Sequence, residues 1–158
     1  MNAFVIGKLR YMLPLYMGAD NNNITKLHRV IMKAARTTLG NYCCKQSINQ
    51  ILNRCKWLPI SLMIKHAAIT TLHTIIINKT PISVTNLLSN IDNTRVIKEI
   101  TTKYIPRTEK YQRFFLYSGL KIYNMIPKKL KNSSKMIFKT KTKNWLQNIT
   151  KGVPDTND

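Results

Sequence analysis

Cys55-Lys56-Trp57-Leu58-Pro59-Ile60 and the apolar run that follows it, as far as about Asn78, decide the predicted fold. On a helical wheel, more than half of the circumference of this run is apolar. A helix with so wide an apolar arc is normally buried on several sides, so the run predicts the central helix of a bundle. Pro59 suits the first turn of this helix, and Pro81 disfavours helix at Thr80.

A narrow polar strip interrupts the apolar arc of this central helix. It consists of His66, Thr70, His73 and Thr74. We expect solvent or a partner to reach the helix along this strip. The histidines at positions 28, 66 and 73 have no acid or nucleophile at a spacing typical of catalysis, so they are predicted to be packing or surface residues.

The charge balance restricts the partners of the chain more than its fold. Among 158 residues, 26 are Lys or Arg and 6 are Asp or Glu, which gives a formal net charge of +20 at pH 7. Such an excess predicts a polyanionic partner, with RNA or DNA as the first candidate. Abundant Asn, Ile and Lys are also typical of AT-rich coding, so a basic surface without such a partner is the alternative.

A regular amphipathic helix is predicted before the central one, from about Ile24 to Leu39, with Asn23 as its cap and Gly40 as its end. Its cations recur at steps of three and four and form one row, which consists of Lys26, Arg29, Lys33 and Arg36. Like charges at this spacing repel one another unless anions neutralise them, so the row predicts a stripe that follows a phosphate backbone. A solvated face is the alternative. The predicted apolar face consists of Ile24, Leu27, Val30, Ile31, Ala34 and Leu39.

From Lys103 to Lys151 the cations far outnumber the acids. A helix is predicted from Arg113 to Ile126, with Pro127 as its end. Its aromatic side chains alternate with cations, including Lys121, and could stack on bases. At helical spacing such side chains more often form a core, and those predicted to pack inward are Phe115, Ile122 and Ile126.

A last helix is predicted after Ser133 or Ser134, either of which can cap it. Its predicted inner face consists of Phe138, Trp145, Leu146 and Ile149. Lys135, Lys139 and Lys143 lie at steps of four along its outer side. They predict a second phosphate-facing row, with the same alternative of a solvated face.

The cysteines and the remaining stretches add smaller expectations. Cys43, Cys44 and Cys55 make an odd count without a framework spacing, so a reducing compartment and buried or half-exposed thiols are predicted rather than a zinc site with His66. The segment from Met1 to Gly18 is too interrupted by charges for a membrane span and has no cleavage site. We therefore expect an intracellular protein, in the nucleus or cytoplasm, with no signal peptide or transmembrane segment. Short helices are predicted at about 46–53 and 83–88, a loop at 90–93, and helix or strand at 95–104.

Three segments in order span most of the chain. The first is LRYMLPLY at 9–16, followed by KLHRVI at 26–31 and AAR at 34–36; the second is WLPI at 57–60, followed by KTP at 79–81 and LL at 87–88; the third is RFF at 113–115, YNMIP at 123–127, FK at 138–139 and WL at 145–146. In order and spacing they resemble the region downstream of the polymerase core in non-LTR (LINE-type) retrotransposon reverse transcriptases of the jockey and RTE kind.

The resemblance implies an all-helical thumb and post-thumb region, which in that family grips the template–primer duplex behind the palm. Met63, Ser83 and Tyr123 depart from the residues usual in the family (Arg, Tyr and Trp), which weakens the transfer of particular contacts. The motif residues that would maintain the packing are Trp57, Leu58, Pro59, Tyr123, Asn124, Pro127, Phe138 and Trp145. The residues expected to contact nucleic acid are Lys26, Arg29, Lys33, Arg36, Arg113, Lys121, Lys135, Lys139 and Lys143.

Catalysis by this chain alone is not expected. Polymerase, endonuclease and ribonuclease H sites need converging carboxylates that hold metal ions. The acids are scattered and include no Asp-Asp pair; they are Asp20, Asp92, Glu99, Glu109, Asp155 and Asp158. We predict no cofactor or metal in this chain, with Mg²⁺ expected only for a polymerase core that the sequence lacks. No Gly-rich phosphate loop is present, and no small-molecule substrate is predicted.

We therefore predict an all-α protein: an irregular helical bundle around a central buried helix at about 60–78, with a basic helical C-terminal part. The expected divisions are a thumb-like bundle at 1–100, a basic extension at 101–150 and a disordered tail at 151–158. The predicted function is that of a non-catalytic fragment of a retrotransposon RNA-directed DNA polymerase that binds the RNA or DNA backbone, with a parent polymerase core as a further partner and no membrane. The alternatives are a helical protein-interaction module and a decayed reading frame without selected function.

Overall fold

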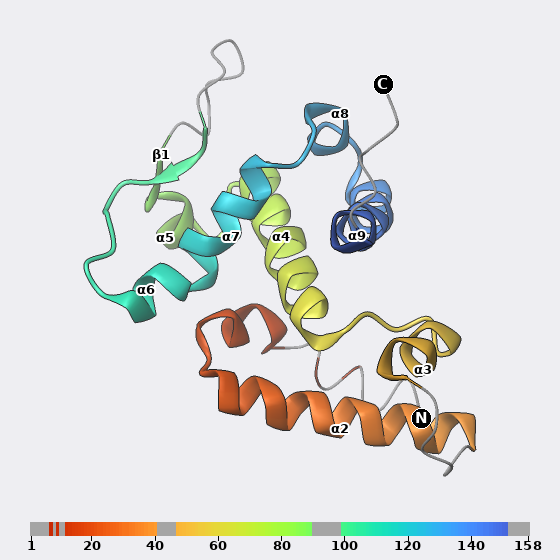
Figure 1. Cartoon of the computed structure of the whole chain (residues 1–158). Coiled ribbons are helices and arrows are strands. Elements are labelled where there is room, and N and C mark those ends of the chain that lie inside the picture. Colours follow the sequence, from red (N-terminus) through yellow and green to blue (C-terminus); the bar gives the residue numbers. More distant parts are fainter. Residues whose placement is uncertain (1–6, 8, 10–11, 41–46, 90–98, 152–158) are drawn as a thin grey trace.

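The computed structural model describes residues 7, 9, 12–40, 47–89 and 99–151, with side chains described as far as residue 148, and its architecture is all-α, as predicted. One long helix, α4 (Ile60–Asn78), runs through the middle of the molecule (Figure 1). The 3₁₀ helix η1 (Leu13–Gly18) and the helices α7 (Phe115–Asn124) and α9 (Lys135–Lys151) pack against it. The helix α2 (Asn21–Leu39) crosses beneath its first turns.

The bounds and the burial of α4 agree with the sequence-based prediction. The helix begins after Pro59 and ends at Lys79, whose backbone is left-handed with a φ of 52°. Its buried side chains are Ile60, Leu62, Met63, Ile64, Ala68, Ile69, Leu72, His73 and Ile75. Among the described helices, α4 alone is long and apolar enough to cross a membrane, and half of it is buried inside the protein. A buried core helix has the same length and composition, so the chain is not a clear transmembrane protein.

Different parts of the chain cover the two halves of α4. Residues from η1, α2 and α3 (Ile48–Arg54) surround the first turns in a cluster that includes Leu13, Ile31, Leu52 and Trp57. The second half packs against the C-terminal helices, where Ile69 contacts a cluster that includes Tyr123, Phe138 and Trp145. The core therefore joins residues that lie far apart in the sequence.

The helix α2 differs in two details from the prediction. It begins after Asp20 rather than after Asn23, and it ends as predicted at Gly40, where a φ of 66° suits glycine. Its buried residues are Ile31, Met32 and Ala35, whereas Val30, predicted to face inward, is 51% exposed. The spacing of apolar residues shows that a helix has a buried face, but it does not give the exact rotation of that face about the helix axis. In α2, the contacts with α3 and α4 determine the rotation.

A capping box starts α3 (Figure 1, yellow). The backbone N–H of Gln50 donates to Ser47 Oγ at 3.4 Å, and the backbone N–H of Ser47 donates to Gln50 Oε1 at 3.2 Å. Two helix-end donors are thereby satisfied. The helix begins two residues later and ends one residue later than the predicted range, 46–53.

The predicted helix from Arg113 to Ile126 is wrong in its bounds. The chain instead forms α6 (Glu109–Arg113), an extended residue at Phe114 (φ −62°, ψ 148°) and then α7. The break lets two short helices pack in different directions, and α7 ends at Asn124. Pro127 caps a further helix, α8 (Lys128–Lys131), and the Ser134 carbonyl accepts a bond from the Phe138 N–H at 2.8 Å at the start of α9.

The segment predicted as helix at 83–88 is also corrected. The helix α5 (Ile82–Thr85) is shorter, because the strand β1 (Leu88–Ser89) pairs antiparallel with β2 (Thr101–Thr102). Several predictions fall outside the described residues: the thiols of Cys43 and Cys44, the loop at 90–93, residues 95–98, the side chain of Ile149, the tail from 152, and residues 1–6, 8, 10 and 11. Of the segment predicted as helix or strand at 95–104, the described part contains the strand β2. The division near residue 100 stays a prediction, and α7 and α9 on its C-terminal side both pack against α4.

Candidate nucleic-acid interface

The row on α2 presents three exposed cations rather than four. Lys26, Arg29 and Lys33 are exposed, whereas Arg36 is half-buried and its buried Nε has no hydrogen-bond partner in the described part of the chain. The three exposed residues form no ion pair with another described residue. In Figure 1, α2 lies along one edge of the molecule. A polyanion could therefore approach three neighbouring positive charges without displacing another element.

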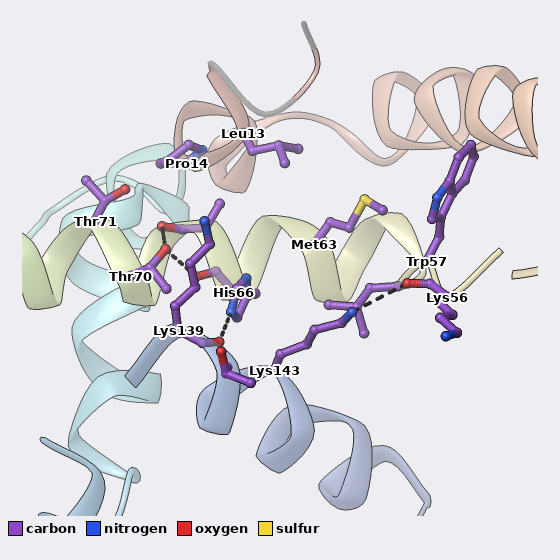
Figure 2. Close-up of a pocket in the computed structure, with 13 residues that line it drawn as sticks. Leu13, Pro14, Lys56, Trp57, Met63, His66, Thr70, Thr71, Lys139 and Lys143 are labelled. Atoms are coloured by element: carbon purple, nitrogen blue, oxygen red, sulfur yellow. Dashed lines mark hydrogen bonds between the residues drawn. The ribbon is translucent and has the colours of Figure 1, made fainter. Parts of the chain in front are cut away.

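The row on α9 is not a simple outward-facing stripe. Lys135 and Lys139 are exposed, and Lys143 is half-buried. Figure 2 shows Lys139 and Lys143 extending from α9 along the side of α4. The Lys143 Nζ donates to the Lys56 carbonyl at 3.4 Å, just before α4 begins. Two of the three lysines therefore point into the space between the helices.

A histidine joins the same two helices. His66 Nε2 on α4 lies 2.8 Å from the Lys139 carbonyl on α9 (Figure 2). A backbone carbonyl can only accept, so His66 carries a proton on Nε2 and donates it. The bond fixes α9 beside α4 next to the two lysines.

These residues line a pocket of about 460 Å³ between η1, the turn before α4, α4 itself and α9 (Figure 2). Its apolar lining includes Leu13, Leu58, Met63 and Ala67. Hydroxyl groups come from Thr70, Thr71 and Thr140, and the lysines are Lys56, Lys139 and Lys143. None of the described lining residues is acidic. The pocket therefore combines an apolar wall with a cationic one.

Two other predicted contacts, Arg113 and Lys121, belong to neither row. Arg113 on α6 is paired with Glu109 one turn earlier in the same helix. Lys121 on α7 lies over the Tyr117 ring, with its Nζ 4.6 Å from the ring centroid. Both cations thus have a local partner, and the structure does not bring them together with the cations of α2 and α9.

The aromatic residues between these cations are largely engaged inside the protein. Tyr123 is buried, Phe115 and Tyr117 are half-buried, and Phe114 packs edge-on against Phe115 with ring centroids 4.8 Å apart. Tyr111 is exposed. Packing therefore accounts for most of these rings.

The motif residues maintain the fold. The side chains of Trp57, Leu58, Tyr123, Phe138 and Trp145 are buried. Pro59 and Pro127 lie at the starts of α4 and α8, and the Asn124 side-chain amide donates to the Ile100 carbonyl at 2.9 Å.

The expectation that solvent or a partner reaches α4 along His66, Thr70, His73 and Thr74 is wrong for His73. His73 is 1% exposed and the other three are half-buried, because α9 lies along this side of α4. The threonines satisfy their hydroxyls on their own helix, where Thr70 Oγ1 donates to the His66 carbonyl at 2.9 Å and Thr74 Oγ1 to the Thr70 carbonyl at 3.0 Å. A strip of polar residues can therefore pack against another helix, and the spacing of these residues in the sequence does not predict such packing.

The described residues contain no group of three His, Cys, Asp or Glu side chains that could hold a metal ion. Cys55 is half-buried, and burial raises the pKa of its thiol. Its Sγ lies 3.8 Å from the Ala35 carbonyl.

The cations could be predicted from the sequence because they depend on residue spacing within one helix. The pocket could not be predicted because it depends on how helices pack together. Steps of three and four place residues on one face, but they do not show which neighbour that face meets. Lys56 carries no helical signal, since it lies in the turn before α4 with a left-handed φ of 55°. The pocket depends on α9 docking beside α4. Compared with protein-family models, curated proteins and solved structures, the chain gives no match.

Proposed function

We propose that this chain binds the phosphate backbone of RNA or DNA without strong sequence preference, as the non-catalytic thumb and post-thumb region of a non-LTR retrotransposon reverse transcriptase. The catalytic core and its Mg²⁺ ions would belong to a parent polymerase. The chain itself would contribute grip on the template–primer duplex rather than chemistry.

The row of exposed cations on α2 is the observation that carries this proposal. Lys26, Arg29 and Lys33 lie at successive steps of three and four on a 19-residue helix, unpaired with any described carboxylate. Adjacent phosphates on a strand are natural counterions for such a row, and their binding releases condensed cations. The net charge of +20 adds a long-range attraction to any polyanion.

Charge reversal of the α2 row tests the proposal. The triple variant Lys26→Glu, Arg29→Glu, Lys33→Glu should abolish binding of a short RNA–DNA duplex in low salt, measured by fluorescence anisotropy. A matched control reverses three exposed lysines elsewhere, Lys103, Lys110 and Lys129, and should keep most of the affinity. Equal losses in the two variants would mean that net charge alone attracts the duplex, and unchanged affinity in the first would contradict the proposal.

A protein-interaction module is a second candidate, favoured by one specific observation. Ile82, Tyr104 and Ile105 expose 69%, 73% and 84% of their surface, respectively. Apolar side chains so exposed are typical of docking sites when they gather on one face. Sedimentation velocity would test this function: self-association that weakens in a triple variant to serine and does not respond to salt would favour it over nucleic-acid binding.

A further inference from the structure

We propose that the pocket between α4 and α9 is a phosphate site that holds one phosphate of a bound strand, with Lys139 and Lys143 as its cationic ligands. The proposal deepens the proposed function and rests on it for the source of the phosphate, but the pocket chemistry stands on its own observations.

The first observation is that two lysines of α9 line the same pocket. Lys139 and Lys143 come from successive turns of α9, and both extend toward α4 (Figure 2). Lys56 lines the same pocket from the turn before α4, and no described lining residue is acidic. Neighbouring lysine ammonium groups of α9 repel each other unless an anion lies between them. A phosphate group would turn that repulsion into attraction.

The second observation is the supply of further hydrogen-bond donors. Each lysine ammonium has three donors. The Lys143 Nζ donates to the Lys56 carbonyl at 3.4 Å, and its other two donors point to the pocket or to solvent. Thr70 and Thr140 donate their hydroxyl hydrogens to carbonyls of their own helices, so Thr71 is the lining threonine that could add a weaker donor. A tetrahedral phosphate accepts from several directions at once, so it suits a set of donors that surrounds it.

The third observation is the fixed frame of the site. The bond from His66 Nε2 to the Lys139 carbonyl, 2.8 Å long, connects the two walls of the pocket beside the lysines. The lysine stems therefore start from a backbone whose position relative to α4 is set before a ligand binds. Such preorganisation lowers the entropic cost of binding.

The fourth observation concerns size and the apolar wall. A volume of about 460 Å³ exceeds the space that a phosphate alone needs and lies in the range of small-molecule sites. Leu13, Leu58 and Met63 line the remaining space. The sugar of the nucleotide that carries the phosphate would contact this wall, so a nucleotide should bind better than inorganic phosphate.

Adenosine 5′-monophosphate is the probe that tests the pocket without a strand. Its binding to the full chain would be followed by ³¹P NMR, with adenosine and inorganic phosphate as comparisons. In the pair Lys139→Gln and Lys143→Gln, we expect binding to weaken by about tenfold, since two charge-assisted bonds are lost. The matched pair Lys129→Gln and Lys141→Gln removes the same charge from exposed positions outside the pocket and should weaken binding by less than about twofold.

A third pair of substitutions, Lys139→Arg and Lys143→Arg, is the control for a folding defect. It keeps both charges, so it should retain nucleotide binding, and circular dichroism should show the same helix content in all three pairs. Equal weakening in the two glutamine pairs would overturn the phosphate site, as would adenosine binding as tightly as its monophosphate.

A short single-stranded oligonucleotide identifies the source of the phosphate. If the Lys139→Gln and Lys143→Gln pair weakens its binding and the nucleotide competes with it, the phosphate belongs to the strand. If the pair affects the nucleotide alone, a strand source is overturned and a free nucleotide is the ligand. If the α2 charge reversal leaves strand binding intact while the pocket pair abolishes nucleotide binding, the proposed function fails and the pocket remains.

Discussion

The imidazole of His73 lies flat against the ring of Phe138, with ring centroids 3.6 Å apart and an interplanar angle of 9°. The His73 Nδ1 is also 3.2 Å from the Tyr123 hydroxyl oxygen. Burial lowers the pKa of His73 and raises the pKa of Tyr123 to about 12. A hydrogen bond between Tyr123 and His73 and the stacking of His73 on Phe138 therefore join α4, α7 and α9 at one buried point.

This relationship predicts that the protein loses stability in mild acid. The pKa of His73 is lower in the folded state than in the unfolded chain, where it is about 6.5. The unfolded state thus binds more protons below that pH, so the free energy of unfolding falls as pH decreases from about 6.5 toward the folded pKa. Urea denaturation at a series of pH values between 7.5 and 5 would measure the fall.

His73→Gln provides the control for this pH dependence. Glutamine does not titrate, so the variant should be less stable than the wild type at pH 7.5 but should lose less stability on acidification. His28 and His66 are present in both proteins, so their contributions cancel in the comparison. Parallel pH profiles for the two proteins would show that His73 is not responsible.

Phe138→Ala should destabilise the protein strongly. Phe138 is 1% exposed and contacts both His73 and Tyr123, so truncation leaves a cavity where three helices meet. We expect a loss of about 3–5 kcal/mol in the free energy of unfolding, a large share of the stability of a domain of this size. Met136→Ala on the same helix is the control: Met136 is 78% exposed, and its truncation should change stability by less than about 0.5 kcal/mol.

Gly119 should tolerate no branched side chain. A Cβ at this position would lie 2.8 Å from Leu72 Cδ1 and 3.7 Å from Ala68 Cβ, so α7 approaches α4 closely here. Gly119→Val should cost about 1–3 kcal/mol through overpacking, as measured by thermal or urea unfolding. Gly18→Ala is the contrasting change, because its Cβ would meet atoms at an ordinary 3.9 Å, and it should unfold as the wild type does.

The α2 row predicts a defined salt dependence of nucleic-acid binding. Neutralising Lys26, Arg29 and Lys33 to glutamine should lower the slope of log affinity against log salt by about 2 to 3, since each phosphate contact contributes about 0.7–0.9. Arg36→Gln should hardly change the slope, because Arg36 is half-buried. A slope change for Arg36 as large as that for each exposed cation would show that four residues, not three, contact phosphates.

Much of the fold follows from local signals in the sequence. The bounds of α4 were predicted from its apolar run between Pro59 and Pro81, and the end of α2 from Gly40. The break at Phe114 could not be predicted, because neither Phe114 nor its two neighbours is a glycine or a proline.

The candidate site also has a part that could be predicted from the sequence and a part that could not. Helical spacing predicted the exposed row on α2, which needs no other element to form. It could not predict that Lys139 and Lys143 point into a pocket or that His73 is buried, since both depend on α9 lying beside α4. The direction in which a helical face points is a tertiary property, and one sequence contains no signal for it.

The division of the core between the two halves of α4 also sets an order of events during synthesis. The first turns can be covered by η1, α2 and α3 as soon as α4 leaves the ribosome, because these elements precede it. Ile69 and Leu72 must wait for α7 and α9, so a nascent chain would expose an apolar stripe until its last helices are made. A premature stop before α7 should therefore yield a product that chaperones retain and proteases remove.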